Sequence, residues 1–123
     1  MKKLNTLKKN YEFKKVLNKG EYYYGKYIQF FIIRNGLNIN RLGIAVSSKV
    51  ASSVERNKIK RLIREIFIKE YKNNIMKGYD FVFIWNKNKK PKEAEYYKIK
   101  EDLKNIFKRN GILINENYSN KIN

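Results

Sequence analysis

Apolar positions near the start of the chain predict a short helix. They recur at the i, i+3, i+4 spacing of a single helical face: Phe13, Val16 and Leu17. We expect this helix to span residues 10–19, with Asn10 as its cap. Gly20 is expected to end it in a left-handed conformation.

Two strand-like segments follow. Residues 22–34 are rich in aromatic and β-branched side chains and predict a strand that is bent or bulged at Gly25. Asn35-Gly36 predicts a turn. Residues 41–47 alternate, which is typical of a strand with one apolar face and one face of small side chains. The apolar face carries Leu42, Ile44 and Val46.

A longer amphipathic helix is predicted from Ser52 to about Tyr71. Ser52 and Glu55 have the spacing of a capping box, in which each side chain bonds the backbone of the other residue. The apolar positions form one stripe, as a core-facing helix requires: Ile59, Leu62, Ile63, Ile66 and Phe67. Lys77-Gly78 is expected to break the helix.

The last part of the chain predicts a strand and a helix. Residues 79–85 are a short continuous apolar run, which suits a strand covered on both faces. Pro91 is expected to begin the last helix, and Gly111 follows its end. Its inward positions are Tyr96, Ile99, Leu103, Ile106 and Phe107. The predicted fold is therefore α+β, a single α/β sandwich with a mixed sheet and the order α-β-β-β-α-β-α.

Composition narrows the possible chemistry. The chain has 123 residues, which is enough for one domain, and 42% of them are hydrophobic, so the chain can bury a core. It contains no cysteine and no histidine, which excludes disulfides, thiolate metal sites and Ser-His triads. The net charge of +18 points to a polyanionic partner, most often nucleic acid. No apolar run is long enough for a membrane span or a secretory signal, so we expect a cytoplasmic protein.

The arginines are concentrated on the central helix. Arg56, Arg61 and Arg64 fall within nine positions, and the segment from Lys49 to Arg64 carries six cations and one acid. Asn57, Arg61 and Arg64 share a stripe opposite the apolar one. Such a face is not built for internal ion pairing, since neighbouring like charges repel. We therefore expect it to bind phosphate groups, for which arginine is well suited.

These residues carry a family resemblance. The stretch RLGIAVSSKVASSVERNKIKRLIREIF resembles the central block of the bacterial ribonuclease P protein component, and LKKNYEFKKVLNKG resembles that family's opening helix. The resemblance extends over about residues 4–112. The helix positions that match the family's RNA-binding motif are Arg56, Asn57, Lys58, Lys60, Arg61 and Arg64.

The resemblance implies a protein that assists an RNA enzyme. The RNA subunit would hold the catalytic magnesium ions and remove the 5′ leader of precursor tRNA, and the protein would have no catalytic residue and no firmly bound metal. The basic helix would bind P RNA, while a cleft between the first helix and the sheet would hold the leader. The matching cleft positions are Phe13, Leu17, Phe31 and Lys49. The resemblance also implies a left-handed βαβ crossover, partners limited to P RNA and precursor tRNA, and no need for a membrane or a protein partner. It gives one RNA-binding domain over residues 1–114. The terminal segment NENYSNKIN, residues 115–123, is expected to be a disordered tail.

Two departures from the family pattern affect the expected contacts. Leu17 stands where the family often has an aromatic residue, and Lys58 replaces an arginine, which keeps the charge but loses the planar fork. Phe13 and Phe31 could equally be ordinary core aromatics. A ribosomal or tRNA-binding protein of similar fold, without leader specificity, remains an alternative. An autonomous nuclease would need clustered carboxylates, such as Asp80 and Asp102, around a metal ion.

Overall fold

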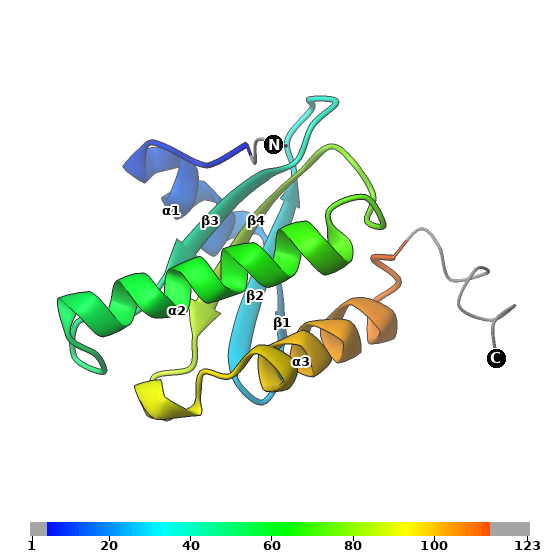
Figure 1. Ribbon diagram of the computed structural model, residues 1–123. Helices are drawn as coiled ribbons and strands as arrows, with labels where there is room; N and C mark the ends of the chain where they lie inside the picture. The colour runs from blue at the N-terminus through cyan, green and yellow to red at the C-terminus, as the bar shows by residue number, and fades with distance from the viewer. Residues whose placement is uncertain (1–4, 114–123) are drawn as a thin grey trace, which may run out of the picture.

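The protein is a three-layer structure in which helices cover both faces of one sheet (Figure 1). The computed structural model describes residues 5–113, so the tail predicted over residues 115–123 lies outside the described residues. Its elements confirm the predicted order: α1 Asn10–Lys19, β1 Glu21–Tyr24, β2 Ile28–Arg34, β3 Arg41–Ala45, α2 Ser53–Ile66, β4 Tyr79–Trp85 and α3 Tyr96–Arg109. A π-helical turn, Phe67–Tyr71, extends α2 to its predicted end, and a short 3-10 helix, Pro91–Glu93, precedes α3.

The sheet has the strand order β1-β2-β4-β3. Strands β1, β2 and β4 pair antiparallel, whereas β3 and β4 pair parallel. The apolar run of β4 is thus central in the sheet, and Phe81, Val82 and Phe83 are all fully buried. This confirms the prediction of a strand covered on both faces.

The β3–α2–β4 connection joins neighbouring parallel strands. In Figure 1, α2 lies on the viewer's side of the sheet, both strands run downward, and β4 lies to the right of β3. This arrangement is a left-handed crossover, the rare hand for such units.

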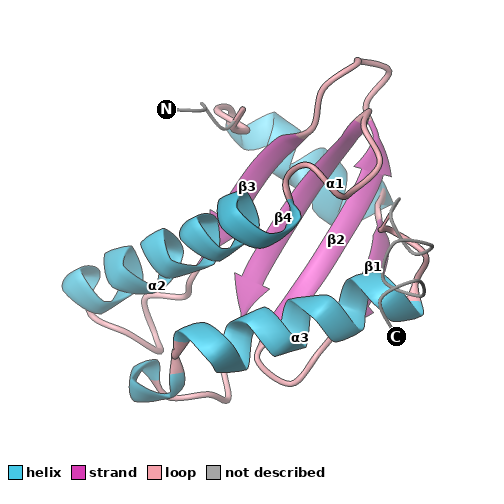
Figure 2. Ribbon diagram, turned by 45° about the vertical axis from the view of Figure 1, so that its right-hand side comes forward, coloured by secondary structure: helices cyan, strands magenta, loops and turns pink. Residues whose placement is uncertain are grey.

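Each face of the sheet has its own core. Figure 2 shows α2 and α3 on one face and α1 on the other. Because successive side chains of a strand alternate in direction, Phe81 and Phe83 point to the large core under α2 and α3, and Val82 points to a small core with Val16 of α1. The small core covers only part of its face, and the partly exposed residues around it define the surface considered below.

The bend predicted at Gly25 divides this segment into two strands, β1 and β2, joined by a turn at residues 25–27, which accounts for the three strands predicted before α2. The turn itself is held by a distant residue. The buried carboxylate of Asp102 on α3 accepts backbone N–H bonds from Lys26, Tyr27 and Ile28 at 2.6–2.9 Å. A side chain at Gly25 would collide with this carboxylate.

Three local predictions at helix ends need correction. Gly20 ends α1 with a φ of −75°, so its backbone is not left-handed as predicted. A Cβ atom at this position would lie 2.5 Å from the carbonyl oxygen of Val16, and this close packing explains the glycine. The N-cap of α1 is Lys9, one residue before Asn10, because Glu12 accepts the backbone N–H of Lys9 at 2.9 Å. Pro91 begins the 3-10 helix and not α3 itself.

Candidate nucleic-acid interface

The basic helix α2 begins with the predicted capping box. Ser52 Oγ accepts the N–H of Glu55 at 3.2 Å, and the Glu55 carboxylate accepts the N–H of Ser52 at 2.8 Å. The hydrogen bond from the backbone N–H of Ser52 lowers the pKa of Glu55, with further lowering from the Ser52 side chain and the charge of Lys58. The cap fixes where the helix starts, and therefore which side chains face outward.

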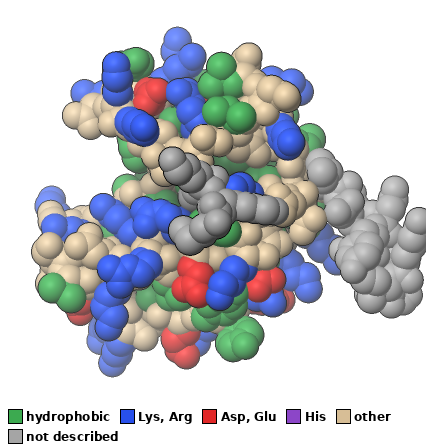
Figure 3. Space-filling view, turned by 45° about the horizontal axis from the view of Figure 1, so that its top comes forward, with side chains coloured by type: hydrophobic (Ala, Val, Ile, Leu, Met, Phe, Trp, Pro, Cys, Tyr) green, Lys and Arg blue, Asp and Glu red, His purple; other side chains and the backbone are tan. Residues whose placement is uncertain are grey.

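The cations of α2 lie largely outside the core. Asn57, Lys58, Arg61 and Arg64 are exposed, while Lys60 is half-buried. Within residues 5–113, Arg61 and Arg64 form no hydrogen bond or ion pair, and the nearby acid Glu65 pairs instead with Lys69 at 2.9 Å. Lys and Arg side chains also spread over most of the face shown in Figure 3, whereas Asp and Glu form a few small groups. Arg61 and Arg64 are therefore available to a partner outside the chain.

Arg56 differs from the other helix arginines. It is half-buried, and its Nη1 donates to the carbonyl oxygen of Ala51 at 3.0 Å. This bond ties the guanidinium to the loop that precedes α2. Arg56 can thus hold the loop and still offer its remaining N–H groups to an anion.

A second surface lies on the sheet face that α1 covers in part. Phe13 of α1 packs on Gly43 of β3, where an added Cβ would lie 2.5 Å from the ring. Phe31 of β2 borders the same small core, and both rings stay partly exposed. The small-residue face predicted for residues 41–47 thus receives the protein's own helix, and the two phenylalanines combine a packing role with an accessible edge.

The other two residues predicted for the leader cleft, Leu17 and Lys49, are exposed. Leu17 on α1 is 38% exposed, and Lys49 lies in the loop between β3 and α2. Lys49 is fixed through its backbone, since its N–H donates to Ser47 Oγ at 3.1 Å, which leaves the ammonium group free to reach outward. Because α1 and α2 lie on opposite faces of the sheet (Figure 2), the basic residues of α2 lie on a different surface from Phe13 and Leu17 of α1.

The carboxylates considered for metal chemistry have structural partners. Asp80 accepts from Arg41 at 2.8 and 2.9 Å and from Asn35 at 2.9 Å, while Asp102 holds the β1–β2 turn. Among the described residues, no group of three or more His, Cys, Asp or Glu side chains could hold a metal ion. The structure therefore gives no support to a carboxylate-based nuclease site.

Arg41 also fixes α1 to the sheet, a role that the sequence did not reveal. Its guanidinium bridges Asp80 on β4 and Glu12 on α1, with N–O distances of 2.8 Å to each. The backbone N–H groups of Lys9 and Lys8, together with Arg41, lower the pKa of Glu12. This ion-pair network therefore helps to hold α1 in position on the sheet.

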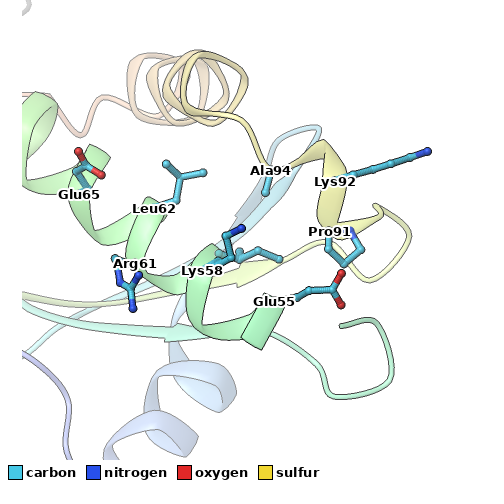
Figure 4. Close-up of a pocket in the computed structure, with 9 residues that line it drawn as sticks. Glu55, Lys58, Arg61, Leu62, Glu65, Pro91, Lys92 and Ala94 are labelled. Atoms are coloured by element: carbon cyan, nitrogen blue, oxygen red, sulfur yellow. The ribbon is translucent and has the colours of Figure 1, made fainter. Parts of the chain in front are cut away.

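A separate hollow of about 530 Å³ lies between α2 and the segment around the 3-10 helix (Figure 4). Some of its lining side chains are apolar: Ile59, Leu62, Pro91 and Ala94. The others carry charges of both signs: Glu55, Lys58, Arg61, Glu65 and Lys92. With both signs at the rim, this hollow lacks the charge asymmetry of a phosphate site.

Comparison with known proteins identifies relatives that cover almost the whole chain. The family model of ribonuclease P matches residues 1–111. The ribonuclease P protein component of Natranaerobius thermophilus is 39% identical over 113 residues, which is 92% of this chain and 96% of that protein.

Solved structures show the same similarity. The RNase P protein of Staphylococcus aureus superposes with a TM-score of 0.76 at 32% identity, covering 89% of this chain and 98% of that one. The Thermotoga maritima RNase P protein gives a TM-score of 0.75 at 32% identity, covering 85% and 96%. No helix among residues 5–113 is long and apolar enough to cross a membrane.

Proposed function

This chain belongs to the ribonuclease P protein family, and on that premise we propose that it binds the catalytic P RNA and the 5′ leader of precursor tRNA. Family membership makes it a component of an endoribonuclease that processes tRNA. The proposal assigns the basic face of α2 to P RNA and the surface beside α1 to the leader. It also gives the protein a cytoplasmic location, with no requirement for a membrane or for a second protein.

The observation that carries the proposal is the unpaired charge of α2. Arg61 and Arg64 are exposed and have no acidic partner within residues 5–113. An arginine guanidinium binds a phosphate through two parallel hydrogen bonds. A folded RNA presents such phosphates in a fixed arrangement, so Arg61 and Arg64 on the polar face of α2, together with the neighbouring Arg56 and Lys60, can contact several of them.

The surface beside α1 suits a single RNA strand. Phe13 and Phe31 offer partly exposed rings on which bases can stack, and Lys49 can contact the backbone. Leu17 adds apolar contact without a ring. We therefore assign the leader-binding cleft to Phe13, Leu17, Phe31 and Lys49.

The chemical step belongs, in this proposal, to the RNA subunit. Magnesium ions held by that RNA would activate the water that cleaves the phosphodiester bond. The protein would supply positive charge that lowers the repulsion between P RNA and precursor tRNA, so that less magnesium is needed. Its carboxylates Asp80 and Asp102 would keep their structural roles.

A cleavage assay at low magnesium tests this assignment. Precursor tRNA is mixed with bacterial P RNA alone, with this protein alone, and with both. We expect cleavage at the mature 5′ end only in the combined sample. Cleavage by the protein alone would contradict the assignment of catalysis to the RNA, and no gain from adding the protein would favour a general RNA-binding protein.

The leader cleft has its own test. We expect replacement of Phe13 and Phe31 by leucine, which keeps apolar volume but removes the rings, to weaken binding of leader-bearing precursor more than binding of mature tRNA. The folded state is checked by circular dichroism. An equal loss on both RNAs would assign the two rings to the core alone.

A further inference from the structure

Three aromatic rings form a continuous row across β1 and β2, beyond the residues assigned above. Tyr22 pairs directly across the strands with Phe31, and their ring centroids lie 4.9 Å apart. Tyr24 follows at the next position on the same face, with its ring 6.0 Å from that of Tyr22 and the two planes within 25°. The row therefore starts at the proposed leader cleft and runs to the edge of the sheet.

The two tyrosines are not needed to complete the core. Tyr22 is 46% exposed and Tyr24 is 64% exposed. Tyr23 between them points to the opposite face, where it packs against Phe30 at 6.3 Å and joins the large core. The alternation of the strand thus separates one structural tyrosine from two that are exposed to solvent.

Polar contacts hold this edge in place. Gln29, opposite Tyr24 in the register, donates from Nε2 to the hydroxyl of Tyr22 at 3.2 Å. Arg109 of α3 donates from Nη2 to the carbonyl oxygen of Tyr24 at 2.9 Å. The β1 edge is therefore attached to α3 as well as to β2, so the tyrosines sit on an anchored strand.

Positive charge continues past the last ring. A hollow of about 450 Å³ lies at the end of β1, lined by Tyr24, Gly25, Lys26, Asp102, Asn105 and Arg109. Lys26 and Arg109 are exposed, whereas the carboxylate of Asp102 is buried and occupied by backbone N–H groups. Cations beside open aromatic faces are the combination that binds a single-stranded nucleic acid.

We propose that the leader-binding surface extends from Phe31 over Tyr22 and Tyr24, so that leader nucleotides farther from the cleavage site stack on the two tyrosines and place their phosphates near Lys26 and Arg109. The proposal rests on the proposed leader-binding function, because it extends the same surface. Single-stranded RNA fits this edge better than an added peptide strand, since the open features are ring faces and cations, and β1 is only four residues long.

The test uses the assembled P RNA–protein complex and non-cleavable precursor tRNAs whose leaders lengthen one nucleotide at a time. The main variant is Tyr22→Thr with Tyr24→Thr, because threonine removes the ring and still favours a strand. Tyr22→Phe with Tyr24→Phe keeps the rings. Tyr97→Ala is the matched control, since Tyr97 is 78% exposed on α3, away from the row.

For the wild-type complex, affinity should rise as the leader lengthens. The threonine variant should lose the later part of this rise, by about fivefold or more for each base that no longer stacks. It should match the wild type on the shortest leaders and on mature tRNA. The phenylalanine variant and Tyr97→Ala should retain the full rise.

Two outcomes overturn the extension while leaving the proposed function intact: a threonine variant that matches the wild type at every length, or one that loses the same factor on every RNA. A wild-type complex whose affinity does not depend on leader length would overturn the leader cleft itself.

Tyr24→Trp gives a second readout that does not depend on a loss of binding. Its fluorescence should change with long-leader precursors only, and an unchanged signal with every precursor would contradict the extension.

Discussion

Removal of the two exposed arginines of α2, Arg61 and Arg64, gives the sharpest test of how this protein binds P RNA. The perturbation is Arg61→Ala with Arg64→Ala. Neither guanidinium has a partner within residues 5–113, so the change leaves no buried group unsatisfied. Because alanine also favours a helix, the free energy of unfolding should change by no more than about 0.5 kcal/mol.

The magnitude follows from counterion release. Each phosphate neutralised by a cation adds about 0.7 to the slope of log affinity against log salt for single strands and about 0.9 for a duplex. If each arginine contacts one phosphate, the double variant should lower the slope by about 1.4–1.8. The loss of affinity should therefore be largest at low salt and shrink as salt rises.

The assay is equilibrium binding of P RNA over a salt series. Lys104→Ala with Lys108→Ala removes the same charge from the exposed side of α3 and should change the slope less. Arg61→Lys with Arg64→Lys should keep the slope, since the charge remains, while affinity falls with loss of the planar fork. A slope equal to that of the wild type, or a drop no larger than that of the α3 control, would refute the assignment of these arginines to phosphate contacts.

Three further changes test the scaffold of the two surfaces. Asp102→Ala leaves two buried N–H groups and one part-buried N–H group without an acceptor, so the free energy of unfolding in urea should fall by about 3 kcal/mol or more, and by clearly less for Asp102→Asn; equal effects would contradict this role. Gly43→Ala places a Cβ against Phe13 and should reduce leader preference while P RNA binding stays unchanged, and an intact leader preference would show that the ring adapts. Folding lowers the pKa of Glu12 from its ordinary value of 4.5. The stabilisation of the folded state by the Glu12 carboxylate is therefore complete above pH 4.5 and is lost as the pH falls through the lower pKa of the folded state. Glu12→Gln should therefore flatten the acid limb of stability below about pH 5, measured by denaturation at a series of pH values, and an unchanged limb would contradict the role of this ion pair.

Elements with local signals could be predicted from the sequence. The capping box at Ser52 and Glu55 and the stripe through Ile59 and Ile63 depend only on residues within a few positions of one another, and the structure confirms both. The apolar run of β4 was recognisable for the same reason. Its place at the centre of the sheet agrees with its burial on both faces.

Features that depend on distant residues could not be predicted in this way. The turn between β1 and β2 could not be predicted from the residues around it, because the acceptor of its hydrogen bonds, Asp102, lies more than 70 residues later in the chain. Gly43 is small because Phe13 packs on it across the sheet. The left hand of the crossover contradicts the general rule for βαβ units, and it entered only through the family resemblance.

The two proposed RNA surfaces also differ in how far nearby residues predict them. The arginine face of α2 follows from local charge asymmetry, and the exposure of Arg61 and Arg64 agrees with it. The cleft around Phe13 and Phe31 joins two elements, so the residues alone left core and surface roles equally open. The row through Tyr22 and Tyr24 was hidden because the sequence assigned no boundary between the two strands.

The strand order also determines when the molecule can take shape during synthesis. Strand β4, Tyr79–Trp85, pairs with both β2 and β3, which leave the ribosome some 40 or more residues earlier. Until β4 emerges, β3 has no strand beside it, the sheet under α2 lacks a central strand, and Val16 of α1 lacks its packing partner Val82. The pairing of such distant segments makes folding slow compared with local helix formation. The nascent chain therefore exposes its cationic helix to cellular RNA before the surface beside α1 exists, and both surfaces are in place only once most of the chain has been made.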